Sequence, residues 1–109
     1  MFVPASPDDL LGNLRCLQSA RAKREFRQSI FEAWQHSCCF CGREANTLDH
    51  LRAKALGGSS FRSNLAACCR RCNKSKGTDE VWGWYQSQPF YCPERAHTLR
   101  TWMEDHEHQ

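Results

Sequence analysis

The chain has 109 residues, of which 40% are hydrophobic and four are tryptophans, and its formal net charge is only +3. This length fits one domain, and the apolar fraction excludes wholesale disorder. No stretch reaches the roughly 18 apolar residues of a membrane span, and Phe2-Val3-Pro4 after Met1 does not look like a signal peptide. The eight cysteines therefore indicate a reducing cytoplasm, with most thiols free or bound to metal.

Residues 1–37 carry two helical patterns. Ser6 and Pro7 suit the N-cap and first position of a helix. Four leucines then recur at helical spacing and predict one apolar face: Leu10, Leu11, Leu14 and Leu17. A second pattern places Phe26, Ile30, Ala33 and Trp34 on one side, and Arg21, Lys23, Arg24 and Arg27 largely off it. These cations suit either solubility or a phosphate backbone, and Cys16 is expected to be a buried small hydrophobe.

Residues 38–77 predict a strand, a long loop, a second strand and a helix. Thr47–Leu51 reads as a short strand around the polar pair Asp49-His50. The loop from Arg52 to Arg62 contains Gly57-Gly58, which we expect to allow backbone geometry that other residues would resist. Residues 65–67 are apolar and favour the second strand, and the helix begins around the second CxxC pair.

Residues 78–109 predict two more helices. Thr78-Asp79-Glu80 begins one ahead of Val81, and Pro89 ends it. Pro93-Glu94 begins the last helix, whose inward residues are expected to be Ala96, Leu99, Trp102 and Met103. The sequence thus predicts an α+β fold with one domain over residues 1–109. N-terminal helices (1–37) and C-terminal helices (78–109) flank a small core (38–77).

Two CxxC pairs frame this core, and they indicate a structural zinc. The four candidate ligands are Cys38, Cys41, Cys69 and Cys72. A two-residue gap lets both thiolates of a pair reach one ion, and two pairs complete a closed tetrahedral site. Zinc would also supply folding free energy that a core of two strands and one helix lacks. Cys39 and Cys68 flank the ligands and are taken as non-ligands, because a one-residue gap strains chelation.

The positive charge is concentrated on the same core. Residues 43–77 carry eight basic and two acidic residues, a net +6, whereas residues 78–109 carry −4. Such a patch suggests a polyanionic substrate, because neutralising phosphates supplies most non-specific nucleic-acid affinity. A merely solvated face is the alternative.

The spacing of several motifs resembles that of the HNH endonucleases of the ββα-metal group, in particular the small stand-alone members of bacteria and their phages. The resemblance covers about forty residues and rests on Cys38-x-x-Cys41, Asp49-His50, Gly57-Gly58, Asn64, Cys69-x-x-Cys72-Asn73 and Lys76-Gly77. Ala53 stands where many members have proline, and Asn73 stands at the last position of the HNH name. The resemblance implies a zinc-stabilised ββα-metal core that hydrolyses phosphodiester bonds of DNA.

The resemblance also implies roles for individual residues. His50 would be the general base, since imidazole titrates near working pH. Asp49 and Asn73 would hold one Mg²⁺ or Mn²⁺ through oxygen, as hard cations prefer. Asn64 belongs to the catalytic group, where we expect it to order the loop around His50. Phosphate contacts are expected from Lys76, Lys74, Arg71, Arg52 and Lys54.

Three functions remain open at this point. The first is a metal-dependent endonuclease that nicks or cuts double-stranded DNA, as a monomer or weak dimer without a membrane partner. The second is a non-catalytic zinc module that binds nucleic acid or protein. The third is a nuclease subunit of a larger phage or defence assembly, because 109 residues leave little surface for reading a long site.

Overall fold

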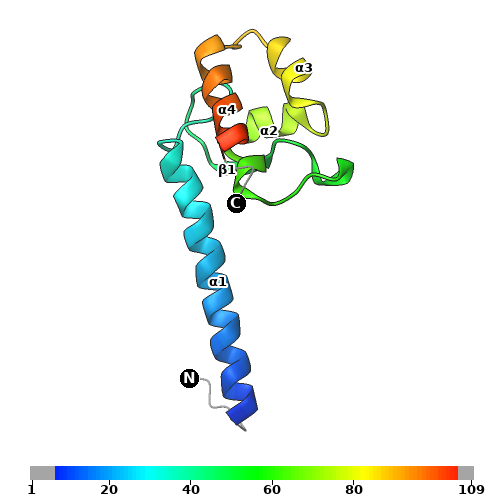
Figure 1. The fold of residues 1–109 in the computed structure, drawn as a ribbon. Coiled ribbons are helices and arrows are strands. Elements are labelled where there is room, and N and C mark those ends of the chain that lie inside the picture. Colours follow the sequence, from blue (N-terminus) through cyan, green and yellow to red (C-terminus); the bar gives the residue numbers. More distant parts are fainter. Residues whose placement is uncertain (1–6, 106–109) are drawn as a thin grey trace.

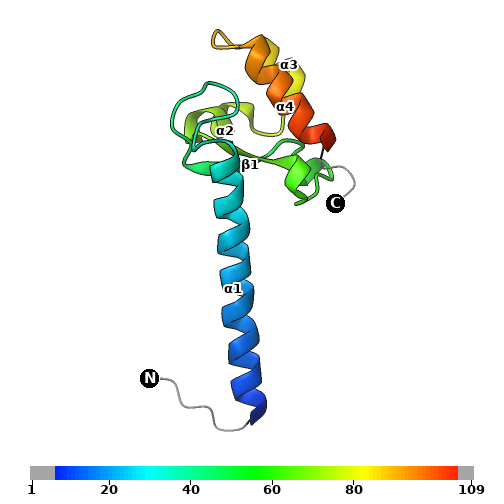
Figure 2. The same cartoon turned by 60° about the vertical axis from the view of Figure 1, so that its left-hand side comes forward.

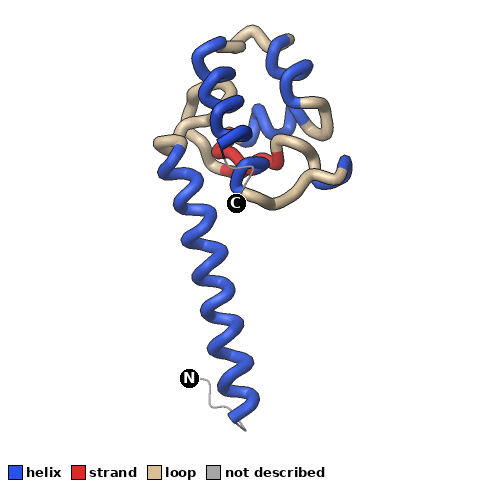
Figure 3. The backbone as a smooth tube through the Cα atoms, in the orientation of Figure 1, coloured by secondary structure: helices blue, strands red, loops and turns tan. Residues whose placement is uncertain are grey.

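The computed structural model describes the backbone of residues 7–105 and the side chains of residues 18–104. The element order is α1 (Pro7–Ala33), β1 (Thr47–His50), η1 (Lys54–Leu56), η2 (Arg62–Asn64), β2 (Leu65–Cys68), α2 (Arg70–Lys76), α3 (Val81–Gln86) and α4 (Pro93–Asp105). The sheet has two strands, and Figures 1 and 3 show α2, α3 and α4 gathered near it. The predicted α+β class and the order strand, loop, strand, helix are confirmed.

The first helix differs from the sequence prediction. The two helical patterns form one continuous helix, α1, which projects from the rest of the molecule (Figures 1 and 2). Every residue from 18 to 28 is exposed, and Ile30 is the first buried residue of the described side chains. The helix stops where Gln35 and His36 adopt left-handed φ angles of 54° and 58°. The predicted apolar face of Leu10, Leu11, Leu14 and Leu17, and the predicted burial of Cys16, lie outside the described side chains.

The sheet has two antiparallel strands, with Thr47 opposite Cys68 and His50 opposite Leu65. Every residue of β2 is buried, whereas only Asp49 is buried in β1. Helix α2 follows β2 after one residue and packs against β1 and α3. This arrangement places the end of β1 beside α2, where the candidate active-site residues lie.

The C-terminal helices close the core with aromatic side chains. Phe40 packs edge-on against Trp84 and Tyr85 at ring-centroid distances of 5.0 and 5.1 Å, and the Tyr85 hydroxyl donates to the Phe40 carbonyl. Ala96 and Leu99 are buried in α4, and Trp102 and Met103 pack against the core, as the sequence predicts. The Trp102 indole donates to the Leu65 carbonyl at 2.8 Å, which ties α4 to β2.

Candidate metal centre and active site

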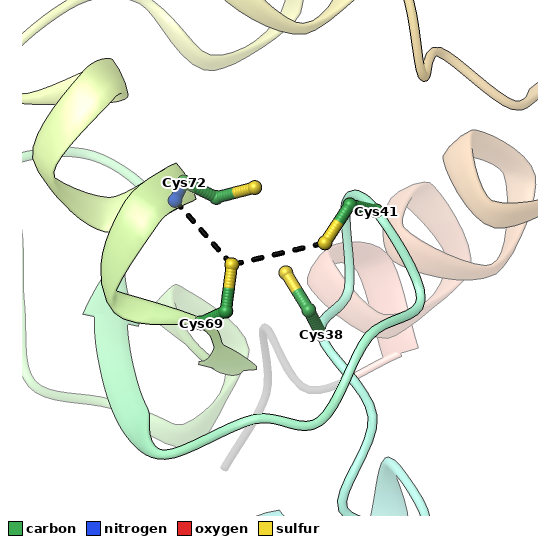
Figure 4. A group of neighbouring side chains, drawn as sticks. All are labelled: Cys38, Cys41, Cys69 and Cys72. Atoms are coloured by element: carbon green, nitrogen blue, oxygen red, sulfur yellow. Dashed lines mark hydrogen bonds between the residues drawn. The ribbon is translucent and has the colours of Figure 1, made fainter.

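The four predicted zinc ligands meet at one point. Cys38 and Cys41 lie on the turn before β1, and Cys69 and Cys72 lie at the start of α2 (Figure 4). Each pair is shaped by backbone N–H groups that point at sulfur. Phe40 N donates to Cys38 Sγ at 3.5 Å, and Cys72 N donates to Cys69 Sγ at 3.4 Å. Gly42 closes the first turn with a φ of +80°, a conformation that favours glycine.

The sulfur geometry suits one tetrahedral ion. All four Sγ atoms lie within 4.8 Å of one another, and the Cys41 and Cys69 Sγ atoms are 3.7 Å apart. A tetrahedron with zinc–sulfur bonds of about 2.3 Å has sulfur–sulfur edges of about 3.8 Å. These cysteines are the one group of three or more His, Cys, Asp or Glu side chains, within the part of the chain that the structure describes, that could hold a metal ion.

The thiols of this cluster differ in pKa. Hydrogen bonds from Cys39 and Cys68 lower the pKa of Cys38 well below its ordinary value. Burial, and then the charge of Cys38, raises the pKa of Cys72, and burial raises that of Cys41. One thiolate therefore opposes the formation of the next. A divalent cation at the centre removes that opposition, because thiolates that coordinate a metal are deprotonated outright.

Cys39 and Cys68 are fully buried and stand outside the ligand set. Cys68 Sγ donates to the Cys69 carbonyl at 3.3 Å, and burial raises the pKa of Cys39 well above its ordinary value. Both behave as small buried thiols, in agreement with the predicted register of the two pairs.

Asp49 faces inward and is paired with Lys76. Its side chain is 6% exposed, and Lys76 Nζ, with no exposure, lies 3.2 Å from Asp49 Oδ2. The ammonium also donates to the carbonyls of His50 and Gly77, each at 3.3 Å. Burial raises the pKa of Asp49, which the charge of Lys76 opposes. The ammonium of Lys76, which the sequence predicts as a phosphate contact, is thus buried against Asp49 in this structure and does not lie on the surface.

Oxygen donors for a hard cation are present at the same place. Despite its ion pair, Asp49 Oδ2 has no hydrogen-bond partner among the described residues. Asn73 is half-buried on α2, and within the described part of the chain its side chain has no hydrogen bond. A buried carboxylate whose oxygen is paired only with the Lys76 ammonium, and an amide without a hydrogen bond among the described residues, are oxygen donors of the kind that Mg²⁺ or Mn²⁺ accepts. The donor set thus fits such a cation, with Lys76 as the positive charge already in contact with Asp49.

His50 ends β1 and is only partly buried, so its ring can reach a substrate. Its Nε2 atom lies 3.2 Å from Ser60 Oγ. Burial, followed by the charges of Lys54 and Lys76, lowers the pKa of His50. A lowered pKa keeps the imidazole neutral at pH 7, which is the state that a general base needs.

Asn64 holds the loop beside His50 through backbone contacts. Its Oδ1 accepts from Arg52 N at 2.8 Å, and its Nδ2 donates to the carbonyls of Arg52 and Ser59 at 3.1 and 2.6 Å. One amide thus joins the residues just after His50 to the residue just before Ser60. The expected loop-ordering contacts of Asn64 are present, and among the described residues no hydrogen bond joins Asn64 to the ring of His50.

The glycine pair and Ala53 explain the shape of this loop. A Cβ on Gly58 would lie 1.8 Å from the Arg52 carbonyl oxygen, so only glycine fits there, and Gly57 has a φ of +85°. Ala53 has a φ of −59°, the value that proline would impose. The backbone therefore has a proline-like conformation at Ala53, the position where many HNH endonucleases carry proline.

The other predicted phosphate contacts lie on the surface. Arg52, Lys54, Arg71 and Lys74 are all exposed. Beside the cysteine cluster, a groove of about 800 Å³ is lined by Arg43, Arg70 and Arg71 among others, a set that sequence reasoning recognised only in part. The buried Lys76–Asp49 pair cancels its own charge, so the remaining residues of the 43–77 segment keep the net +6.

Sequence reasoning missed two features of the site. No sequence signal singled out Ser60, because serine is ordinary in a loop and its contact with His50 depends on how the loop folds back. The burial of Lys76 had a weak signal. Asp49 is the inward residue of its strand, and a buried carboxylate requires a partner.

Comparison with known families agrees with this geometry. Residues 38–80 match the family model described as HNH endonuclease, which confirms the resemblance drawn from the motif spacing. The match spans the cysteine cluster, β1, β2 and α2 and leaves α1 and α4 outside. No curated protein and no solved structure matches the chain. In the described residues, no helix is long and apolar enough to cross a membrane. The family match indicates a nuclease.

Proposed function

We propose that the protein is a divalent-metal-dependent endonuclease that hydrolyses phosphodiester bonds of double-stranded DNA. The observation that carries the proposal is the HNH endonuclease match over residues 38–80, joined to the placement of His50 beside Asp49 at the end of β1. In this proposal residues 1–109 form one domain, with the nuclease site in the core and the helices as its support.

His50 is the general base of the proposed reaction. Its partly exposed ring takes a proton from a water molecule that attacks the scissile phosphorus. The lowered pKa of His50 leaves the base lone pair available at neutral pH. Of the two charges that lower it, Lys54 is exposed and therefore also suits a nearby phosphate, whereas Lys76 is buried.

Asp49 and Asn73 are the proposed ligands of Mg²⁺ or Mn²⁺. When bound, such an ion supplies positive charge to the non-bridging and leaving oxygens of the phosphate. The residues of this chain contribute a buried carboxylate oxygen without a hydrogen bond and an amide without a partner in the described part of the chain. Lys76 pairs with the Asp49 carboxylate at 3.2 Å.

The four cysteines hold a structural zinc in this proposal. Two pairs of thiolates leave no open position on the ion, so it would stabilise the fold and take no part in hydrolysis. DNA would lie over the exposed cations Arg52, Lys54, Arg71 and Lys74, whose phosphate contacts are independent of base sequence.

The test is cleavage of supercoiled plasmid DNA by the purified zinc-loaded protein, with and without added Mg²⁺ or Mn²⁺. Wild type should cut only with the divalent ion, and His50→Ala should lose nearly all activity. His97→Ala is the matched control, because His97 is exposed on α4 and should be dispensable. Equal cutting by His50→Ala and wild type, or no cutting with either ion, rejects the endonuclease.

A second candidate function has one observation in its favour. Lys76 already neutralises Asp49, as expected of a zinc module that binds nucleic acid without cutting it. In that case the protein would bind DNA equally well with and without Mg²⁺, and plasmid would stay intact. A nuclease subunit of a larger assembly would instead cut weakly alone and strongly with its partner.

A further inference from the structure

The loop after β1 presents a hydroxyl to the ring of His50. Ser60 Oγ lies 3.2 Å from His50 Nε2, within hydrogen-bond distance, although ten residues separate them. Both side chains are accessible enough for substrate and water to reach the ring. In the part of the chain that the structure describes, Nε2 is the ring nitrogen of His50 with a hydrogen-bond partner.

Neutral imidazole carries one N–H donor and one acceptor nitrogen, and a hydrogen-bond partner on one nitrogen sets which of the two carries the proton. A hydroxyl can accept from Nε2–H, which leaves the lone pair on Nδ1. A general base needs its lone pair free toward water, so the partnered nitrogen is the one that should carry the proton. We propose that Ser60 is a positioning residue that orients the His50 ring and holds the proton on Nε2, so that Nδ1 acts as the base.

The loop is built to hold Ser60 at that distance. Asn64 Nδ2 donates to the Ser59 carbonyl at 2.6 Å and to the Arg52 carbonyl at 3.1 Å. Gly58 packs its α-carbon so closely on Arg52 that a Cβ would meet the Arg52 carbonyl oxygen at 1.8 Å. The segment that carries Ser60 is therefore anchored on both sides to the backbone that directly follows His50.

Proton transfer then follows a definite path. A water proton moves to His50 Nδ1 while the water oxygen forms a bond to phosphorus and the bond to the leaving oxygen breaks. The ring becomes an imidazolium whose Nε2–H still donates to Ser60 Oγ. The hydrogen bond is retained as charge forms, and bonds to charged donors are stronger than neutral ones. This inference rests on the proposed endonuclease, because the tautomer is assigned from what a general base needs; the contact between Ser60 and His50 rests on geometry alone.

The first test needs neither DNA nor activity. Long-range ¹H–¹⁵N spectra of the zinc-loaded protein, at a pH where histidine is neutral, identify the protonated nitrogen of His50, with His50→Ala for assignment. Wild type should carry the proton on Nε2, with the signal of a hydrogen-bonded N–H that Ser60→Ala loses and Ser60→Thr keeps. A proton on Nδ1, or a signal unchanged in Ser60→Ala, overturns the proposal.

The second test separates this inference from the endonuclease itself. In plasmid cleavage, Ser60→Ala should lower kcat about tenfold with an unchanged KM for DNA, as is common when the partner that orients a histidine is removed. Ser60→Thr should recover the rate, and Ser63→Ala is the control serine on the same loop. If wild type does not cut, the endonuclease fails while the spectra still decide the role of Ser60. If Ser60→Ala cuts like wild type, the positioning role fails while the endonuclease stands.

Discussion

The cysteine cluster and the active-site residues lie in the same small core but are built in opposite ways. The cluster is assembled from two local turns, each of which places two sulfurs through backbone contacts. The proposed active site is assembled from three separate elements: β1 supplies Asp49 and His50, the loop supplies Ser60, and α2 supplies Asn73 and Lys76.

The two sites also differ in how their charge is balanced. The cysteine cluster concentrates groups whose negative charges oppose one another, so it depends on a cation from outside. The active site contains its own cation, because Lys76 is buried against Asp49. The first site should therefore control folding through metal, whereas the second should remain folded without a metal and depend on Lys76.

The largest effect should come from breaking the cysteine cluster. Cys72→Ser removes one of four ligands, and a structural zinc supplies about 10–16 kcal/mol of apparent binding energy, more than a small domain can lose. We expect a zinc-free, largely unfolded protein by circular dichroism and zinc analysis. Cys92→Ser is the control, because Cys92 stands outside the cluster. A well-folded Cys72→Ser protein without zinc would contradict the structural role of the cluster.

A smaller but still large effect should follow from removing the internal cation. Lys76→Met leaves the Asp49 carboxylate buried without its ion pair, and breaking a buried pair costs about 3–5 kcal/mol. Chemical denaturation should show this loss, whereas Lys74→Met, an exposed neighbour on α2, should change the unfolding free energy by less than about 0.5 kcal/mol. Equal stability of the two variants would mean that the ion pair does not balance Asp49.

The same contrast explains how much could be predicted from the sequence. The zinc ligands and the β-β-α order follow from local spacing, since a CxxC turn and an alternating strand are properties of neighbouring residues. The sequence predicts that Lys76 contacts a DNA phosphate, because a lysine at this place in the resembled motif, near Asn73, suits that contact. Its burial arises only when α2 packs on β1, and the one sequence signal for it is weak: an inward Asp49 on β1 needs a positively charged partner.

The N-terminal helix α1 is a second feature that the sequence predicted only in part. Two helical patterns separated by a polar stretch predicted two helices. The stretch between them consists largely of good helix formers and contains no proline, so the helix continues through it. The buried Asp49–Lys76 pair makes a substitution of Asp49 a structural change as well as a catalytic one. Asp49→Ala would leave the buried Lys76 ammonium without its ion-pair partner, so it should destabilise the fold as well as inactivate the site.

A third, more local effect should come from the glycine pair. Gly58→Ala places a Cβ 1.8 Å from the Arg52 carbonyl oxygen and must move the loop, at a cost of about 1–3 kcal/mol. Cleavage should fall steeply while the zinc-bound core stays folded. Gly57→Ala is the matched control: its Cβ meets nothing within 4 Å, so its cost is the left-handed φ alone. If both variants cut DNA equally well, the close approach at Gly58 does not hold the site.

The smallest effect should appear in the pH dependence. Because burial and nearby charges lower the pKa of His50 from its ordinary value of about 6.5, kcat/KM should rise with pH along an acidic limb centred below that value and then level off. Lys54→Gln removes a positive charge that opposes protonation, so the His50 pKa should rise and the acidic limb should move roughly a few tenths of a unit to higher pH. Added salt should shrink that difference, since Lys54 is exposed.

Arg43→Gln is the control for this prediction. Arg43 is exposed and does not affect the pKa of His50, so its removal should leave the acidic limb in place. A limb that stays in place in Lys54→Gln would show that Lys54 does not act on His50. The active-site charge balance would then rest on Lys76 and burial alone.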